Sequence, residues 1–245
     1  MTSIATVRGF FVAGTDTGVG KTEVARALLS LLRGAVPLKP VETGCEPEDP
    51  KDALALLRAS GGGFELDEVC PYRFRLPAAP LVAADAEGKA ISVERIEQLV
   101  ARAAPRPVVV EAAGGLLVPL AREIAAFTLE QADPAERAPA ATLVTNLDLA
   151  ERLGLPVLLV GRAGLGTLNH CALSAEALAS RGVELRAIVL NRVVSEDDPT
   201  VASNARLVEE LTGAIVLGPT PFVADASARP AAIALELGRL VEPRR

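Results

Sequence analysis

The chain has 245 residues, of which 50% are hydrophobic and only 3% aromatic, and its net charge is −6. This composition predicts one α/β domain over residues 1–245 with an aliphatic core, the composition typical of buried parallel strands. No Lys/Arg run forms a basic patch, and no apolar run reaches the ~20 residues of a membrane span, so we expect neither a nucleic-acid nor a membrane partner.

Apolar runs alternate along the chain with segments of helical pattern. In chain order, the strands are expected at Val7–Ala13, Val36–Val41, Val108–Glu111, Pro156–Val160, Leu185–Leu190 and Ala214–Leu217, the second and last being weaker. The helices are expected at Thr22–Leu32, Val93–Ala103, Leu147–Leu153, Leu168–Ser180 and Val201–Leu211. This alternation predicts a mostly parallel sheet with helices on both faces and a site at the carboxyl ends of its strands.

The first strand leads into a glycine-rich turn, FFVAGTDTGVGKT over Phe10–Thr22. A strand, a glycine-rich loop and a helix beginning with Lys-Thr are typical of a P-loop, whose amides and helix N-terminus bind phosphates. We expect Lys21 to reach the β- and γ-phosphates and the Thr22 hydroxyl to bind Mg²⁺. The spacing departs from GxxxxGK[ST], because Thr15 stands where the first glycine belongs. The alternative is a glycine-rich turn that only caps a helix.

Acidic residues near strand ends are candidate magnesium ligands, since Mg²⁺ prefers oxygen donors. Glu111 ends a buried strand and precedes small residues that let a ligand approach; alternatively it is a solvated strand-end charge. Asp52 opens a helix and is either a ligand or that helix's N-cap. Glu23 and Asp16 are further alternatives, with Glu23 expected to face solvent in the first helical turn.

Lysine and cysteine usage narrows the candidates further. Of 25 basic residues only four are lysines, two of which are Lys21 and Lys39. Pro40 disfavours helix at Lys39, so the segment is extended or turning. This lysine is expected to reach the γ-phosphate and neutralise charge during phosphoryl transfer; a surface lysine is the alternative.

The three cysteines are scattered, which predicts no disulfide framework or zinc site. No signal peptide is expected, so we expect a cytoplasmic protein.

Five motifs, taken together and in order, resemble the dethiobiotin synthetase family. They are Gly14–Thr22, Lys39–Gly44, Asp52–Leu56, Glu111–Gly115 and Asn191. Further matches, which extend the resemblance from residue 10 to about residue 225, lie at Pro71-Tyr72, Gly166–His170 and Leu217–Phe222. The resemblance implies a P-loop NTPase-type fold and an enzyme that consumes ATP with Mg²⁺.

The resemblance also implies the reaction. One amine of 7,8-diaminononanoate takes up CO₂ as a carbamate, the carbamate attacks the γ-phosphate of ATP, and the second amine closes the ureido ring of dethiobiotin as phosphate leaves. Because the nucleophile belongs to the substrate, catalysis is expected from positioning and electrostatics. The family is a homodimer whose substrate crosses the interface, so a homodimer is expected.

Residue roles follow from the resemblance by position. Lys21 and Lys39 are the expected catalytic residues, and the expected magnesium ligands are Thr22, Asp52 and Glu111. The expected ATP-binding residues are Gly18, Val19, Gly20, Lys21, Thr22, Glu23, Asp52, Glu111, Gly114, Asn191, Arg192, Pro221, Phe222 and Val223, with Asn191 reading adenine. The expected substrate residues are Thr17, Thr43, Leu165, Gly166 and Asn169. The single histidine, His170, is expected to be structural.

Three departures from the family pattern concern the substrate side. Ala112 replaces a glycine, Glu42 adds an acid, and Arg122–Ala141 is longer than usual, either a lid or a surface insertion. Two other classes of P-loop protein are the alternatives. A corrin-type amide ligase usually carries a glutaminase domain for which this chain has no room, and a partitioning ATPase places a second lysine where Asp16 stands.

Overall fold

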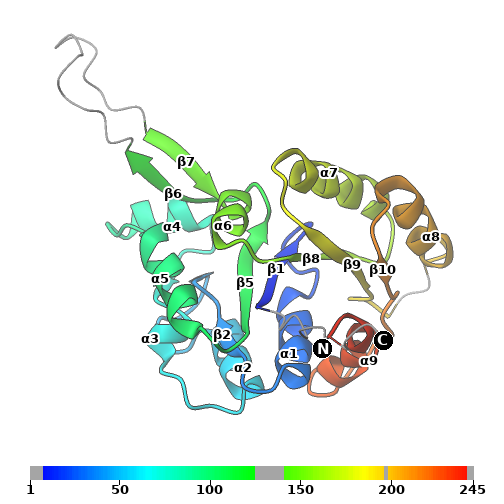
Figure 1. The fold of residues 1–245 in the computed structure, drawn as a ribbon, viewed down its shortest axis with the longest axis horizontal. Coiled ribbons are helices and arrows are strands. Elements are labelled where there is room, and N and C mark those ends of the chain that lie inside the picture. The colour runs from blue at the N-terminus through cyan, green and yellow to red at the C-terminus, as the bar shows by residue number, and fades with distance from the viewer. Residues whose placement is uncertain (1–7, 125–140, 196–197, 242–245) are drawn as a thin grey trace, which may run out of the picture.

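A computed structural model describes residues 8–124, 141–195 and 198–241. Its centre is a six-stranded sheet in the order β10-β9-β8-β1-β5-β2, in which every neighbouring pair is parallel (Figure 1). The strands are β1 (Gly9–Gly14), β2 (Val36–Leu38), β5 (Val108–Gly115), β8 (Val157–Arg162), β9 (Leu185–Asn191) and β10 (Val216–Leu217). The predicted parallel sheet is confirmed.

Two short sheets flank the central one. Strand β3 (Val41–Thr43) pairs in parallel with β4 (Tyr72–Phe74), and β6 (Pro119–Ile124) pairs antiparallel with β7 (Ala141–Thr145). The β6–β7 ribbon extends away from the body of the molecule (Figure 1). The expected lid or insertion over Arg122–Ala141 falls mostly on residues 125–140, which lie outside the described residues.

Helices cover both faces of the central sheet, as predicted. They are α1 (Lys21–Leu31), α2 (Lys51–Ala59), α3 (Leu66–Val69), α4 (Pro80–Ala86), α5 (Val93–Ala103), α6 (Asn146–Leu153), α7 (Thr167–Ser180), α8 (Val201–Thr212) and α9 (Arg229–Val241). None of the helices within the described ranges is long and apolar enough to span a membrane.

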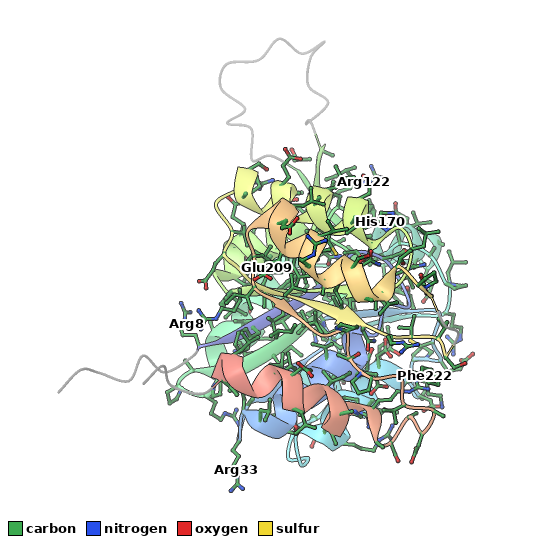
Figure 2. All side chains as sticks on the ribbon, turned by 90° about the vertical axis from the view of Figure 1, so that its right-hand side faces the viewer. Arg8, Arg33, Arg122, His170, Glu209 and Phe222 are labelled. Atoms are coloured by element: carbon green, nitrogen blue, oxygen red, sulfur yellow. The ribbon has the colours of Figure 1, made fainter. Side chains whose placement is uncertain are left out.

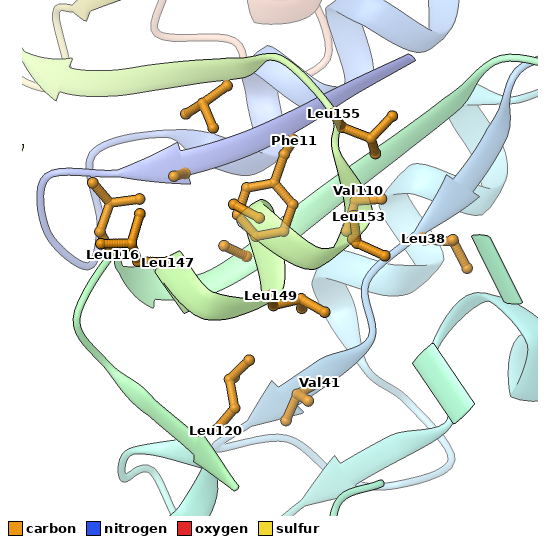
Figure 3. Close-up of a cluster of buried hydrophobic side chains, with 14 of the residues drawn as sticks. Phe11, Leu38, Val41, Val110, Leu116, Leu120, Leu147, Leu149, Leu153 and Leu155 are labelled. Carbon is orange, nitrogen blue, oxygen red and sulfur yellow. The ribbon is translucent and has the colours of Figure 1, made fainter. Parts of the chain in front are cut away.

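Side-chain alternation along β1 shows how the two cores form, since successive residues of a strand point to opposite faces. Phe10 and Val12 pack with side chains of α1 and α9 in one core. Phe11 and Ala13 pack in the other with side chains of α5, α6, α7 and α8, and Figure 3 shows Phe11 in that cluster beside Val110. Burial on both faces explains why the strand reads as an unbroken apolar run.

One predicted strand is wrong in its extent. The run Val36–Val41 was expected as a single strand, but β2 ends at Leu38 and β3 begins at Val41 in another sheet. Pro40 has no N–H for a ladder, and the amide of Lys39 donates to the carbonyl of Val69 (2.8 Å) instead. The break lies between the two sheets, at the residue expected to reach phosphate.

Candidate active site

The glycine-rich turn joins β1 to α1 and keeps the start of α1 open. Gly18 and Gly20 have φ values of +73° and +93°, the left-handed region that favours glycine. A Cβ at Gly20 would lie 2.0 Å from Nδ2 of Asn191, so only glycine fits there. No side chain in the described ranges caps the N-terminus of α1, whose amides and dipole therefore remain available to an anion.

Lys21 begins α1 and folds back over the turn. Its ammonium is buried and donates to the carbonyl of Asp16 (2.9 Å). Burial, together with repulsion from Lys39, lowers the pKa of Lys21 to about 8. The Asp16 carboxylate in turn pairs with Arg162 at the end of β8 (2.8 Å), so both the turn and its lysine are held in place.

Lys39 and Glu111 form a buried ion pair beside the turn. The Lys39 ammonium donates to Oε1 of Glu111 (2.6 Å) and lies 3.5 Å from Oδ2 of Asp52. The Thr22 hydroxyl donates to the same Glu111 oxygen (3.0 Å). Burial alone would lower the pKa of Lys39, but Glu111 and Asp52 outweigh it and raise that pKa, so the ammonium stays charged. Burial raises the pKa of Glu111, and Lys39 offsets part of that rise.

The oxygen atoms around this pair fit a magnesium ion. Glu111 is 1% exposed, and its Oε2 has no hydrogen-bond partner among the described residues, which is costly unless a ligand completes it. The Thr22 hydroxyl and the half-exposed Asp52 carboxylate supply further hard donors. Within the described ranges no three Asp, Glu, His or Cys residues form a metal cage; Mg²⁺ needs none, because it keeps several waters and takes phosphate oxygens.

Glu42 has a structural role that the sequence did not reveal. Its two carboxylate oxygens accept the amides of Asp52 (3.1 Å) and Ala53 (2.9 Å) at the start of α2. The N-cap residue is Pro50, whose side chain has no hydrogen-bond acceptor. Asp52 lies inside the helix, so the N-cap interpretation of Asp52 is wrong. Glu42 thus caps α2 from β3 and leaves the Asp52 carboxylate unused by its own helix.

These residues meet in one cleft of roughly 920 Å³. Its lining brings together fifteen of the predicted site residues from widely separated parts of the chain, which are Thr17, Gly18, Gly20, Lys21, Thr22, Glu23, Lys39, Thr43, Asp52, Glu111, Gly114, Asn191, Arg192, Pro221 and Val223. The carboxyl ends of β1, β5 and β9 all open into it, as expected for a parallel sheet.

The chain resembles known proteins over nearly its whole length. A family model described as an AAA domain matches residues 8–132 and 130–229. An ATP-dependent dethiobiotin synthetase of Anaeromyxobacter dehalogenans (strain 2CP-C) is 45% identical over 243 residues, 96% of this chain and 100% of that protein. One of Bacillus subtilis (strain 168) is 32% identical, covering 89% of each chain. This chain belongs to the dethiobiotin synthetase family.

A likeness to a solved structure supports the fold alone. The ParA family ATPase from Chlorobium tepidum TLS has a TM-score of 0.52 over 96% of this chain and 93% of that chain, at 12% identity. Together with the AAA-domain family model and the parallel central sheet, it confirms the P-loop NTPase-type fold expected for this chain. At this identity the likeness says nothing of partitioning activity, whereas the synthetase relatives match at 32% identity and above.

Five expected site residues of this synthetase family member do not line the cleft. Val19 lies within the phosphate loop with its side chain fully buried. Phe222, labelled in Figure 2, stands between the lining residues Pro221 and Val223 in the chain. The expected substrate residues Leu165, Gly166 and Asn169 lie at the start of α7, away from the lining. His170 follows them on α7 and is exposed, outside the cleft (Figure 2).

Several lining residues were not expected. The segment 77–80 leads into α4, and Arg229 and Ile233 come from α9. Arg229 donates to the carbonyls of Val223 (2.7 Å) and Ala224 (3.2 Å), so it orders the loop beside the cleft. The proline-rich stretch before α4 was one available signal, but α9 carries no motif and was missed entirely.

Proposed function

We propose that the chain is an ATP-dependent dethiobiotin synthetase that closes the ureido ring of 7,8-diaminononanoate with CO₂, releasing ADP and phosphate. The observation that carries the proposal is the buried Lys39–Glu111 pair beside the uncapped start of α1. The pairing keeps the Lys39 ammonium charged next to the glycine-rich turn, where the phosphoryl group would be transferred. Identities of 45% and 32% with named synthetases support the same assignment.

The chain's own residues serve this reaction by holding charge and position. The amides of Gly18 and Gly20 and the ammonium of Lys21 hold the triphosphate. Lys39 faces the γ-phosphate and neutralises charge as the carbamate oxygen attacks phosphorus and ADP departs. The hydroxyls of Thr17 and Thr43, both in the cleft lining, hold the carbamate. The second amine then attacks the carbamate carbon, and phosphate leaves.

The proposed magnesium site uses Thr22, Asp52 and Glu111. When bound there, Mg²⁺ supplies positive charge to the phosphate oxygens. Glu111 Oε1 is already occupied by Lys39 and Thr22, so its orphaned Oε2 is the atom left for the ion. Asp52 is presented from α2, whose first turn Glu42 holds.

The proposal includes a cytoplasmic homodimer. Leu165, Gly166 and Asn169 do not line their own cleft, and Gly166 is the N-cap residue of α7, where no side chain in the described ranges caps the helix. Amides at a helix N-terminus bind carboxylates, and the nonanoate has one at the far end of its chain. Leu165 is 79% exposed and Leu173 on α7 is 57% exposed, which a second subunit would cover.

Product analysis tests the proposal. With MgATP, bicarbonate and 7,8-diaminononanoate we expect a ureido product by mass spectrometry and one ADP for each product molecule. Omitting the diamine or the bicarbonate should abolish ADP release beyond background. ADP release that is indifferent to the diamine would reject the synthetase assignment and leave a plain ATPase.

A further inference from the structure

The side-chain amide of Asn191 lies at the end of β9 and lines the cleft. Its Nδ2 donates to the carbonyl of Val19 in the phosphate loop (2.9 Å), and its Oδ1 accepts from the hydroxyl of Thr220 (2.7 Å). Because a carbonyl only accepts hydrogen bonds, Val19 determines which end of the amide carries the nitrogen. The orientation of Asn191 is therefore fixed before any ligand arrives.

Thr220 gives the second restraint. Its side chain is fully buried, and its amide donates to the carbonyl of Leu190 (2.9 Å), which ties it to β9. Its hydroxyl oxygen also accepts from the amide of Arg192 (3.3 Å). With one lone pair engaged there, the hydroxyl hydrogen is directed at Oδ1 of Asn191. The nearby Gly20 leaves no space for a side chain against Nδ2, so the amide is also closely packed.

We propose that Thr220 is a positioning residue that fixes the Asn191 amide so that the site accepts a 6-amino base and rejects a 6-oxo base. This rests on the proposed function, with ATP in the cleft and its base at Asn191, the residue to which the family resemblance assigns adenine. Each amide atom has one bonding position left, an acceptor on Oδ1 and a donor on Nδ2. That pair matches the N6 amino group of adenine and its neighbouring ring nitrogen.

A 6-oxo purine reverses the requirement at the exocyclic position. Its O6 would face Oδ1, acceptor against acceptor. To accommodate it, the Asn191 amide would have to turn over, which breaks the bond from Thr220 and brings Oδ1 against the carbonyl of Val19. Preference for the amino base is thus a property of the residues behind Asn191 as well as of Asn191 itself.

The test compares ATP with inosine triphosphate, which differs at the 6-position of the base. Thr220→Val removes the hydroxyl and keeps the shape, while Thr220→Ser keeps the hydroxyl. For T220V we expect KM for ATP to rise about fivefold to tenfold, the loss of one hydrogen bond, with kcat at saturation within about twofold. The ATP-to-inosine-triphosphate ratio of kcat/KM should fall by a similar factor. T220S should keep the wild-type ratio.

Every outcome of these measurements either supports or overturns the positioning role of Thr220. An unchanged ratio in T220V, or an equal fall in kcat for both nucleotides with a lowered Tm, would overturn the inference in favour of a structural role. If T220V cannot be purified folded, Thr220→Ala is measured in the same way. Calorimetric binding of ADP and inosine diphosphate gives the preference without the reaction. Wild-type protein that binds ADP selectively but makes no ureido product would reject only the proposed function.

Discussion

The side chains at the two ends of the cleft are held in place by different kinds of interaction. At the end proposed to bind phosphate, here called the phosphate end, Lys39, Glu111 and Asp52 are linked by buried charge, and Lys21 is desolvated beside them. At the end proposed to bind the base, here called the base end, Asn191 and Thr220 are linked by neutral hydrogen bonds to each other and to the backbone. The first set lies near β2 and β5, and the second lies near β9 and β10, on the other side of β1 in the sheet (Figure 1).

The difference indicates how the chemistry is divided between the two ends. Leaving a buried charge without its partner costs ~3–5 kcal/mol, whereas a neutral hydrogen bond contributes only ~1 kcal/mol. Changes at the phosphate end should therefore remove turnover, and changes at the base end should alter only nucleotide affinity and preference.

Removing the Lys39 charge should have the largest effect. In Lys39→Met we expect kcat to fall about 10³-fold, because a preorganised charge at the reacting group is lost. The free energy of unfolding should fall by ~3 kcal/mol, since Glu111 stays buried without its partner. Steady-state kinetics and urea unfolding measure the two.

Lys39→Arg is the matched control for charge. A planar guanidinium cannot occupy the position of a compact ammonium, so we expect ADP binding to persist while kcat still falls at least 10²-fold. Wild-type turnover in Lys39→Arg would remove Lys39 from the mechanism and with it the contrast between the two ends.

The phosphate end was largely predictable from the sequence because its parts carry local patterns. The strand, the glycines and the Lys-Thr pair stand within Phe10–Thr22, and the apolar alternation gave the central strands and five helices. The scarcity of lysine singles out Lys39 from the sequence alone, without reference to its partner. What the sequence could not give was the pairing itself, since Lys39 and Glu111 are separated by 72 residues.

The base end was predictable only in outline. Resemblance pointed to Asn191, but its partners Val19 and Thr220 are 172 and 29 residues away and are neutral, so no pattern of charge indicates them. In the sequence Glu42 is only an extra acid. Its role depends on the fold, which brings the first turn of α2 next to β3. Helices α4 and α9 were missed because their place in the fold is set by packing rather than by a motif.

The pH dependence of ATP binding tests the desolvation of Lys21. With a pKa of about 8, against 10.5 ordinarily, Lys21 in the free protein loses its charge as pH rises through 8. At pH 9 only about a tenth is charged, so we expect KM for ATP to rise up to about tenfold between pH 7 and pH 9. Bound triphosphate favours the ammonium, so binding near pH 8 should take up protons, which calorimetry in two buffers detects.

Stability should respond to pH in the opposite sense. Between pH 8 and 10.5 the unfolded chain holds the Lys21 proton more readily than the folded chain, so this group makes the free energy of unfolding rise with pH. Weaker ATP binding that merely follows a loss of folded protein would contradict the assignment to Lys21, as would binding near pH 8 without proton uptake.

The smallest effect should come from Glu42, whose carboxylate lines the cleft and accepts the amides of the first turn of α2, from which Asp52 projects. In Glu42→Gln one carboxylate oxygen becomes an NH₂ group facing a helix amide, so the first turn of α2 loosens. We expect Tm to fall by ~2–4 °C and the magnesium concentration for half-maximal activity to rise about threefold, with kcat at saturating magnesium unchanged.

The matched control is Glu68→Gln on α3, where Glu68 accepts the amide of Glu65 (3.3 Å) outside the cleft lining. It should lower Tm similarly and leave the magnesium requirement alone. If both variants raise the magnesium requirement equally, the effect comes from a general loss of stability, and Glu42 has no specific effect on magnesium binding.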